Sequence, residues 1–68
     1  MNKEYPIIEA WEEYYNYLED LRQSGVTNMF GAVPYLKAEF KLNDASARNI
    51  LANWMHNYSE LKEKYGWW

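Results

Sequence analysis

Three polar residues near the centre of the chain have side chains that can read base edges in duplex DNA. Arg48, Asn49 and Asn53 fall on the side of a predicted helix that is opposite its apolar stripe. Arginine pairs with guanine edges and asparagine with adenine edges in the major groove. Lys37 and Lys41 come before this helix, where such domains contact phosphate. The sequence therefore predicts these five residues as a candidate DNA-binding set.

The charge distribution argues against an extensive DNA contact. The net charge is −3, and residues 1–20 alone hold one basic and six acidic residues. Residues 21–58 hold four basic and two acidic residues, which makes the central part mildly basic, with a charge of +2. Four cations neutralise few phosphates. Double-stranded DNA is thus one hypothetical partner, and another protein is the alternative.

The aromatic content favours the protein-contact alternative. The chain has four Trp, seven Tyr and 19% aromatic residues, more than so small a core needs. The candidate protein-binding residues combine the C-terminal aromatic pair with two acidic positions, and are Trp67, Trp68, Glu9 and Glu13. They would contact another protein or a second copy in a homodimer. Alternatively, the two Trp rings close the end of the helical bundle over Trp11 and Tyr14.

No catalytic centre can be assembled from the sequence. His56 is the single histidine, cysteine is absent, and neither a Gly-rich phosphate loop nor an HExxH metal-binding spacing occurs. We therefore expect no enzyme activity, no cofactor and no metal site. No apolar run approaches the roughly 20 residues that span a bilayer. The N-terminus is too acidic for a signal peptide, so we expect a cytoplasmic protein without a membrane partner.

The first helix is predicted to begin at Pro6, which suits a first helical turn, and to end near Gln23. Its apolar positions recur at steps of three and four and are Ile7, Trp11, Tyr14, Leu18 and Leu21, with Ile8 and Tyr15 widening the stripe. Its acidic residues are predicted on the opposite, solvated face. Ser24 and Gly25 then end the helix.

The second helix is predicted at about residues 32–40, with Pro34 in or near its first turn. A helix that started at Asn28 would hold Pro34 too deep in its interior. Met29 and Phe30 precede the helix and either pack into the core or form an exposed contact surface.

A long third helix is predicted from Asp44 to Tyr65, with Asn43 as its N-cap and Gly66 as its stop. Its apolar stripe consists of Ala47, Ile50, Leu51, Trp54, Tyr58, Leu61 and Tyr65. A separate fourth helix that begins at Ser59-Glu60 is the alternative, and the sequence leaves both open.

These elements predict an all-α fold, with one domain over residues 1–68. The predicted domain is a compact three-helix bundle, in which the long third helix is either continuous or broken into a fourth. Residues 36–51 form a predicted helix-turn-helix-like unit. In this unit the small Ala38 and Ala47 let two helices approach each other, and Leu42 fills the turn.

A motif in residues 26–55 adds a resemblance to a family. The pattern GVTNMFGAxPYL, then a Phe-Leu turn, an Ala and an IL..WM ending corresponds here to Gly25 through Leu36, then Phe40, Leu42, Ala47, Ile50, Leu51, Trp54 and Met55. In these residues the chain resembles small uncharacterised proteins of tailed double-stranded DNA phages and prophages. The resemblance implies a helix-turn-helix-like unit, a viral source, the host-cell cytoplasm and a host or phage protein as partner, but no function. A Gly more often separates the Phe and Leu in that group, where this chain has Lys41.

Overall fold

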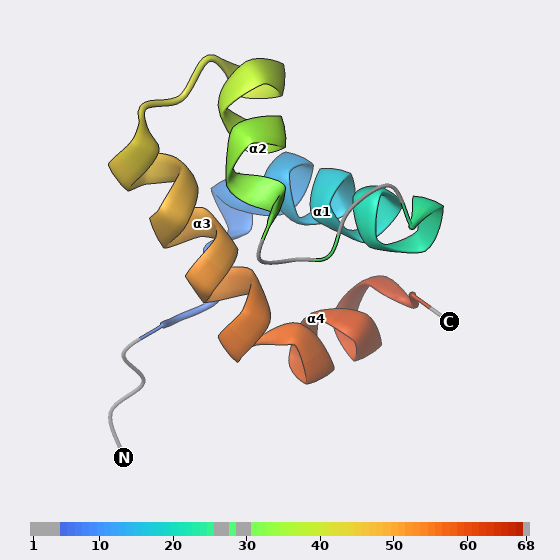
Figure 1. Ribbon diagram of the computed structural model, residues 1–68. Helices are drawn as coiled ribbons and strands as arrows, with labels where there is room; N and C mark the ends of the chain where they lie inside the picture. The colour runs from blue at the N-terminus through green and yellow to red at the C-terminus, as the bar shows by residue number, and fades with distance from the viewer. Residues whose placement is uncertain (1–4, 26–27, 29–30, 68) are drawn as a thin grey trace.

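The computed structural model describes residues 5–25, 28 and 31–67, and all regular structure within them is helical (Figure 1). A 3₁₀ helix and four α-helices follow one another as η1 (Glu9–Trp11), α1 (Glu12–Ser24), α2 (Ala32–Phe40), α3 (Asp44–His56) and α4 (Tyr58–Tyr65). The predicted all-α class is confirmed. The predicted three-helix bundle is not, because the described part of the chain contains four α-helices.

The first helix begins later than the sequence predicts, so the placement of Pro6 in its first turn is wrong. Residues 5–8 precede the helices, and Ile8 is extended, with φ of −110° and ψ of 114°. The Pro6 carbonyl oxygen accepts a hydrogen bond from the side chain of an asparagine in α3. Side chains from elsewhere in the fold therefore replace the helical hydrogen bonds that were predicted for this segment.

Glycine ends both α1 and α4, as predicted. α1 stops at Ser24, one residue past the predicted Gln23, and α4 stops at Tyr65. Gly25 and Gly66 follow these helices, and each has a φ of 70°, a left-handed conformation that glycine adopts without strain.

α2 covers the predicted residues 32–40, and Pro34 lies in its first turn, as predicted. Before the helix, the Asn28 Oδ1 atom accepts a hydrogen bond from the Gly31 amide at 2.9 Å. Asn28 is therefore a turn residue that precedes the helix. Met29 and Phe30, which the sequence places either in the core or on an exposed contact surface, lie outside the described part of the chain.

A three-residue turn connects α2 to α3. Lys41 ends α2 in a left-handed conformation, with φ of 54° and ψ of 46°, and the Leu42 amide donates to the Lys37 carbonyl oxygen at 3.2 Å. Asn43 then caps α3, as predicted, because its Oδ1 atom accepts a hydrogen bond from the Ser46 amide at 2.7 Å. Lys41 therefore occupies a left-handed position, which glycine would adopt with less strain.

The predicted helix over residues 44–65 is broken at Asn57 into α3 and α4. Asn57 has φ of −105° and ψ of 11°, and its amide still donates to the Asn53 carbonyl oxygen at 3.1 Å. Of the two alternatives left open by the sequence, the broken helix is the observed one. Its predicted start at Ser59-Glu60 is wrong, because the residue in the N-cap position is Asn57.

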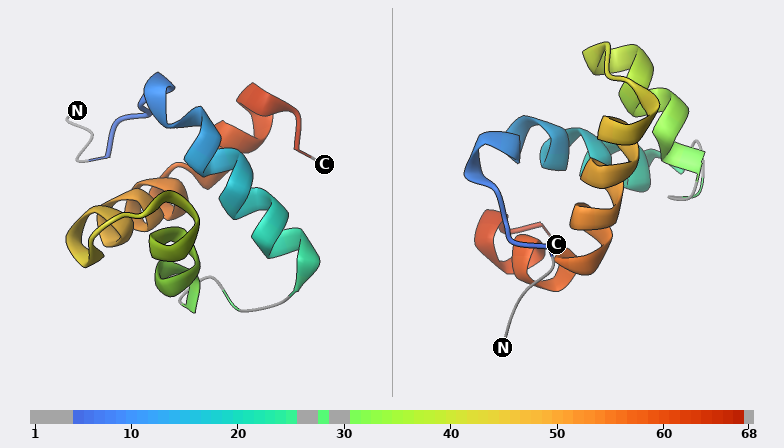
Figure 2. Two further views of the ribbon diagram at one scale, coloured as in Figure 1. Left: turned by 90° about the horizontal axis from the view of Figure 1, so that it is seen from above. Right: turned by 90° about the vertical axis from the view of Figure 1, so that its left-hand side faces the viewer.

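The core lies between α1 and the α2–α3 pair that α1 crosses (Figure 2). Its buried apolar residues come from all four α-helices and are Tyr15, Leu18, Leu21, Ala32, Leu36, Ala47, Ile50, Leu51, Trp54 and Leu61. Ala47 is buried as predicted, whereas Ala38 is exposed, so its predicted part in the helix contact is wrong. This shared core holds α2 and α3, which carry most of the candidate site residues, in fixed positions.

Candidate binding surfaces

Two candidate DNA-binding cations share one carboxylate at the start of α3. The Arg48 Nε atom donates to Asp44 Oδ2 at 2.5 Å, and the Lys37 Nζ atom lies 3.6 Å from Asp44 Oδ1. All three side chains are exposed, and that of Arg48 is exposed most, at 71%. We call Lys37, Asp44 and Arg48 the Asp44 cluster. Its two cations and one anion give a net charge of +1.

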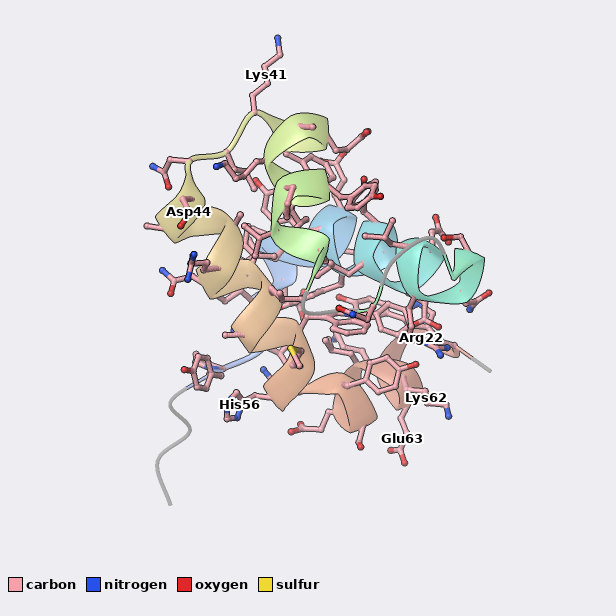
Figure 3. All side chains as sticks on the ribbon, viewed as in Figure 1. Arg22, Lys41, Asp44, His56, Lys62 and Glu63 are labelled. Carbon is pink, nitrogen blue, oxygen red and sulfur yellow. The ribbon has the colours of Figure 1, made fainter. Side chains whose placement is uncertain are left out.

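The other two exposed candidates lie apart from Arg48. Lys41 extends away from the body of the molecule at the end of α2 (Figure 3). Asn49 lines a small hollow on the flank of α3 that faces Trp11 and Tyr14. Arg48 lines a groove on the flank of α3 that faces α2. The structure therefore exposes four of the five predicted DNA-binding residues but distributes them over two flanks of α3 and the preceding turn.

Asn53 is not on the outward face of α3, so its prediction as a base-reading residue is wrong. It is 3% exposed. Its Oδ1 atom accepts a hydrogen bond from the Tyr15 hydroxyl, and its Nδ2 atom donates to the Pro6 carbonyl oxygen, both at 2.7 Å. Asn57 is buried as well and donates to the Tyr5 carbonyl oxygen at 2.6 Å. Both asparagines therefore hold the N-terminal segment against the helices.

The described C-terminal aromatic residue packs within the chain. Trp67 is half-buried, stacks on Tyr65 with ring centroids 5.5 Å apart, and lies 6.1 Å from the Tyr58 ring. It thus covers rings of α4 instead of the predicted Trp11 and Tyr14. Trp68, the other residue of the C-terminal Trp pair, lies outside the described residues. A protein contact through these two residues remains a prediction.

The acidic candidates for protein contact lie at the beginning of the first helical segment. Glu9 Oε2 is 3.3 Å from Lys64 Nζ, and Glu13 is exposed. An exposed ion pair of this kind contributes little to stability. Both carboxylates are accessible to a partner, and their part in a protein contact also remains a prediction.

One acidic residue of α1 is not on the solvated face where the sequence predicts it. Glu19 is 3% exposed and accepts hydrogen bonds from Arg22 Nη2 and Gln23 Nε2, each at 2.8 Å. Burial acts to raise the pKa of Glu19, but hydrogen bonds from Arg22, Gln23 and Tyr58 hold it below its ordinary value. Burial and the hydrogen bond with Glu19 raise the pKa of Tyr58. Arg22, which is bonded to Glu19, lies over the Tyr58 ring at 5.5 Å from its centroid, so the Glu19–Arg22 pair connects α1 to α4.

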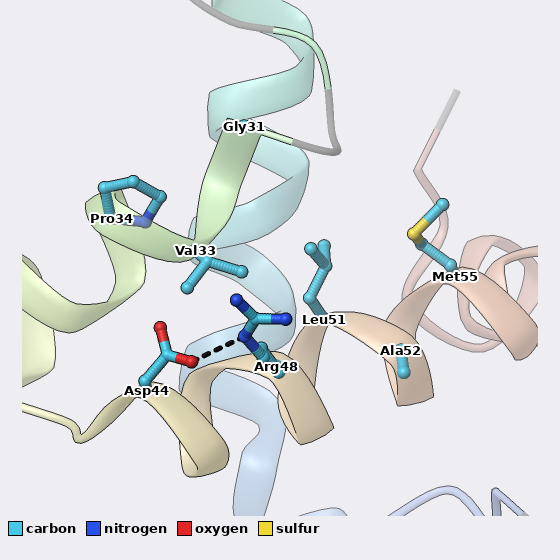
Figure 4. Close-up of a pocket in the computed structure, with 8 residues that line it drawn as sticks. All are labelled: Gly31, Val33, Pro34, Asp44, Arg48, Leu51, Ala52 and Met55. Atoms are coloured by element: carbon cyan, nitrogen blue, oxygen red, sulfur yellow. Dashed lines mark hydrogen bonds and ion pairs between the residues drawn. The ribbon is translucent and has the colours of Figure 1, made fainter.

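An open groove lies between the first turn of α2 and the length of α3 (Figure 4). Its volume is about 490 Å³, and it is lined by Gly31, Val33, Pro34, Asp44, Arg48, Leu51, Ala52 and Met55. We call it the α2–α3 groove. Most of its lining is apolar, Met55 is 38% exposed, and the Asp44–Arg48 pair lies toward one end. Sequence analysis missed this site, because Val33 and Pro34 join the α3 residues only when the two helices pack.

The acidic and histidine side chains do not gather at one place. The described residues contain no group of three or more His, Cys, Asp or Glu side chains that could hold a metal ion. His56 stacks on Tyr5, with ring centroids 4.1 Å apart and 15° between the ring planes.

In the part of the chain that the structure describes, no helix is both long enough and apolar enough to cross a membrane.

Comparison with known proteins finds no family model, no curated protein and no solved structure that matches the chain significantly. The function of the surfaces must therefore be inferred from their own geometry and chemistry.

Proposed function

We propose that the chain is a small protein-binding domain whose docking surface is the α2–α3 groove. The observation that supports this proposal is an apolar space of about 490 Å³ that is open to solvent and lined by Val33, Leu51 and Met55. Leu51 is already buried, but Met55 is 38% exposed and Val33 is half-buried, so covering these two side chains contributes a part of the about 1.5–3 kcal/mol gained when a fully exposed one is buried. A partner that covers the groove therefore gains binding energy from contacts that the free protein leaves unmade.

The proposed occupant is an amphipathic helix of another protein. Helices bind to grooves of this kind through apolar side chains at i, i+3, i+4 and i+7. Leu51 and Met55 are four residues apart on α3, so their side chains form a row with which such a spacing can interdigitate. The flexible thioether of Met55 adapts to the shape of the partner. The phage resemblance makes a host or phage protein the first partner to consider.

A selection of displayed helical peptides tests this proposal. The full chain is immobilised and exposed to a library of peptides of about 16 residues, a length at which isolated helices begin to form. Met55→Asp places a charge in the groove, and it should abolish capture of the selected peptides. The matched control is Tyr35→Asp, because Tyr35 has the same 38% exposure but does not line the groove. Capture that survives Met55→Asp would contradict the proposal.

A second candidate function is contact with duplex DNA, which the exposed face of α3 favours. α2, the three-residue turn and α3 have the element order of a helix-turn-helix unit, whose second helix enters the major groove. Arg48 and Asn49 are exposed near the start of α3, and Lys41 extends from the turn. The buried Asn53 has no part in this candidate. The Asp44 cluster weakens it, because phosphate must compete with the Asp44 carboxylate.

Fluorescence anisotropy of a labelled random-sequence duplex tests the DNA candidate. Lys37, Lys41 and Arg48 allow at most three phosphate contacts, for which affinity falls about 40-fold between about 50 and about 200 mM salt. Lys41→Glu should weaken such binding further. No change in anisotropy with about 100 μM protein would remove DNA as a candidate partner.

A further inference from the structure

We infer that the helix that occupies the α2–α3 groove carries a carboxylate that binds Arg48. This inference rests on the proposed protein-binding function and specifies the chemistry of the partner. Three observations support it. Arg48 has N–H donors without an acceptor among the described residues, the Asp44 cluster has one positive charge in excess, and Arg48 lies about one helical turn from the apolar lining of the groove.

Arg48 has hydrogen-bond donors left for a partner. A guanidinium group carries five N–H donors. Within the described part of the chain, Arg48 is bonded through Nε, to Asp44, and its two terminal nitrogens have no acceptor. Figure 4 shows these nitrogens directed away from Asp44, toward Val33 and Leu51. Two parallel N–H groups match the two oxygens of a carboxylate, so an acidic side chain of the partner fits this position.

The Asp44 cluster has one positive charge in excess. Asp44 directs Oδ1 toward Lys37 and Oδ2 toward Arg48, so a single carboxylate serves two cations. A second carboxylate beside Arg48 balances this excess and gives an alternating arrangement of charges. The side chains are exposed and salt screens their attraction, so the carboxylate selects and orients the partner more than it adds affinity.

The spacing along α3 places the partner's carboxylate about one turn from its apolar side chains. Arg48 precedes Leu51 by three residues and Met55 by seven, and all three line the same groove. A partner helix that lies along this row presents an acidic residue three or four positions from its nearest apolar anchor. A nucleic-acid backbone supplies an anion but no apolar group to cover Val33 and Met55, which is why we infer a protein partner.

The sequences of the peptides captured by the full chain test the inference. We expect Asp or Glu to be enriched at one position, three or four residues from the first apolar anchor. One enriched peptide is then synthesised with a fluorescein label, together with versions in which the acidic residue is Gln or Lys. The affinity of the protein should fall about two- to fivefold for the Gln peptide, as expected for an exposed ion pair, and further for the Lys peptide.

Arg48→Glu supplies the reciprocal test. The acidic peptide should bind this variant weakly, and the Lys peptide should recover affinity for it. Because the Arg48 side chain is 71% exposed, the fold should persist, which circular dichroism checks. Arg48→Met keeps the length of the side chain without its charge and serves if Arg48→Glu unfolds. The matched control is Lys64→Glu, a charge reversal outside the groove that should leave peptide affinity unchanged.

The outcomes separate this inference from the proposed function. Peptides that require Met55 but show no acidic preference, and that bind Arg48→Glu as tightly as wild type, overturn the inference and leave the groove as a docking surface. No groove-dependent capture overturns both. Duplex DNA that binds the wild type but not Arg48→Glu, with no peptide captured, also overturns both, because the guanidinium donors then serve phosphate.

Discussion

At the scale of single residues, Lys41 has the least favourable backbone conformation. It is the one residue other than glycine with a positive φ among those that the structure describes. The left-handed conformation costs an L-residue about 1–2 kcal/mol, whereas glycine adopts it readily. The side chain of Lys41 extends into solvent, so no contact of that side chain opposes its replacement.

We expect Lys41→Gly to stabilise the protein by about 0.5–1 kcal/mol, because the released strain exceeds the added entropy of glycine in the unfolded chain. Thermal unfolding followed by circular dichroism should show a higher midpoint, by roughly 4–8 °C per kcal/mol for a domain of this size. Lys41→Ala is the control, since alanine keeps the Cβ atom and the strain. A midpoint of Lys41→Gly at or below that of the wild type would contradict the assigned strain.

Glu19 makes the stability depend on pH in a defined direction. Burial acts to raise the pKa of Glu19, but its hydrogen bonds and the charge of Arg22 lower this pKa in the folded protein. A carboxyl group with a lowered pKa stabilises the fold fully above its unfolded pKa, which is about 4.3. This contribution is lost as the pH falls from that value through the lower pKa of the folded state.

We therefore expect the free energy of unfolding to fall below about pH 4.3, and Glu19→Gln to reduce this pH dependence. Urea unfolding at a series of pH values measures the effect. At neutral pH, Glu19→Gln should destabilise the protein by about 1–3 kcal/mol, because charge-assisted hydrogen bonds at a buried site are lost. Glu13→Gln, at an exposed position, controls for the change in net charge. If the free energy of unfolding of Glu19→Gln depends on pH as strongly as that of the wild type, the pKa of Glu19 is not lowered in the folded protein.

At the scale of elements, the N-terminal segment 5–8 is held by side chains and not by regular structure. Asn53 donates to the Pro6 carbonyl oxygen. The Ile8 amide donates to the Tyr15 hydroxyl at 3.1 Å, and that hydroxyl donates to Asn53. One network thus links the segment to α1 and α3, and each buried polar group in it depends on the others.

We expect Asn53→Ala to destabilise the protein by about 1–3 kcal/mol, because the buried Tyr15 hydroxyl loses its acceptor and the Pro6 carbonyl loses the donor of a part-buried hydrogen bond. Urea unfolding measures the loss, and the Ile8 amide should exchange faster with deuterium because its acceptor is no longer held. Asn49→Ala is the matched control, an exposed asparagine one turn earlier whose loss should change stability by less than about 0.5 kcal/mol. Equal effects of the two substitutions would show that the network contributes nothing.

At the scale of the whole molecule, one aromatic core supports a very small domain. A chain of 68 residues has a net stability of roughly 3–10 kcal/mol. Trp54 is 3% exposed and packs edge-on against Tyr58, with ring centroids 4.8 Å apart. Its Nε1 atom has no hydrogen-bond partner among the described residues, so the ring stabilises the fold through apolar packing.

Trp54→Ala should therefore destabilise the protein by about 3–5 kcal/mol, which is comparable with its total stability. We expect the cooperative thermal transition to be lost or moved to much lower temperature, as followed by circular dichroism. Met55→Ala is the control at the next residue, which is exposed in the groove and should melt close to the wild type. If Trp54→Ala melts as the wild type does, the core face of α3 is misassigned.

The elements that could be predicted are those determined within a few residues along the chain. Residues 32–40 form a helix with Pro34 in its first turn, and Asn43 caps the next helix, because both effects act within one helical turn. Ile50 and Trp54 are buried, as the helical period of the apolar residues predicts.

The buried polar residues could not be predicted in this way. Periodicity assigns a polar side chain to solvent unless a partner is known, and the partners of Asn53 are distant in sequence. Asn53 is separated from Pro6 by 47 positions and from Tyr15 by 38. Glu19 is bonded to Arg22 and Gln23 of its own helix, but its burial arises only when α1 packs against the other helices. These contacts also explain why one predicted DNA-binding residue proved to be structural.

The sequence by itself therefore determined the all-α class, the capping residues and most helix ends, because each depends on interactions within one turn of the chain. Only the tertiary structure decided that Asn53 and Glu19 are buried, that the last helix breaks at Asn57, and that α2 and α3 leave an apolar groove. These features arise from contacts between side chains that are far apart in sequence, and such contacts exist only after the helices have packed.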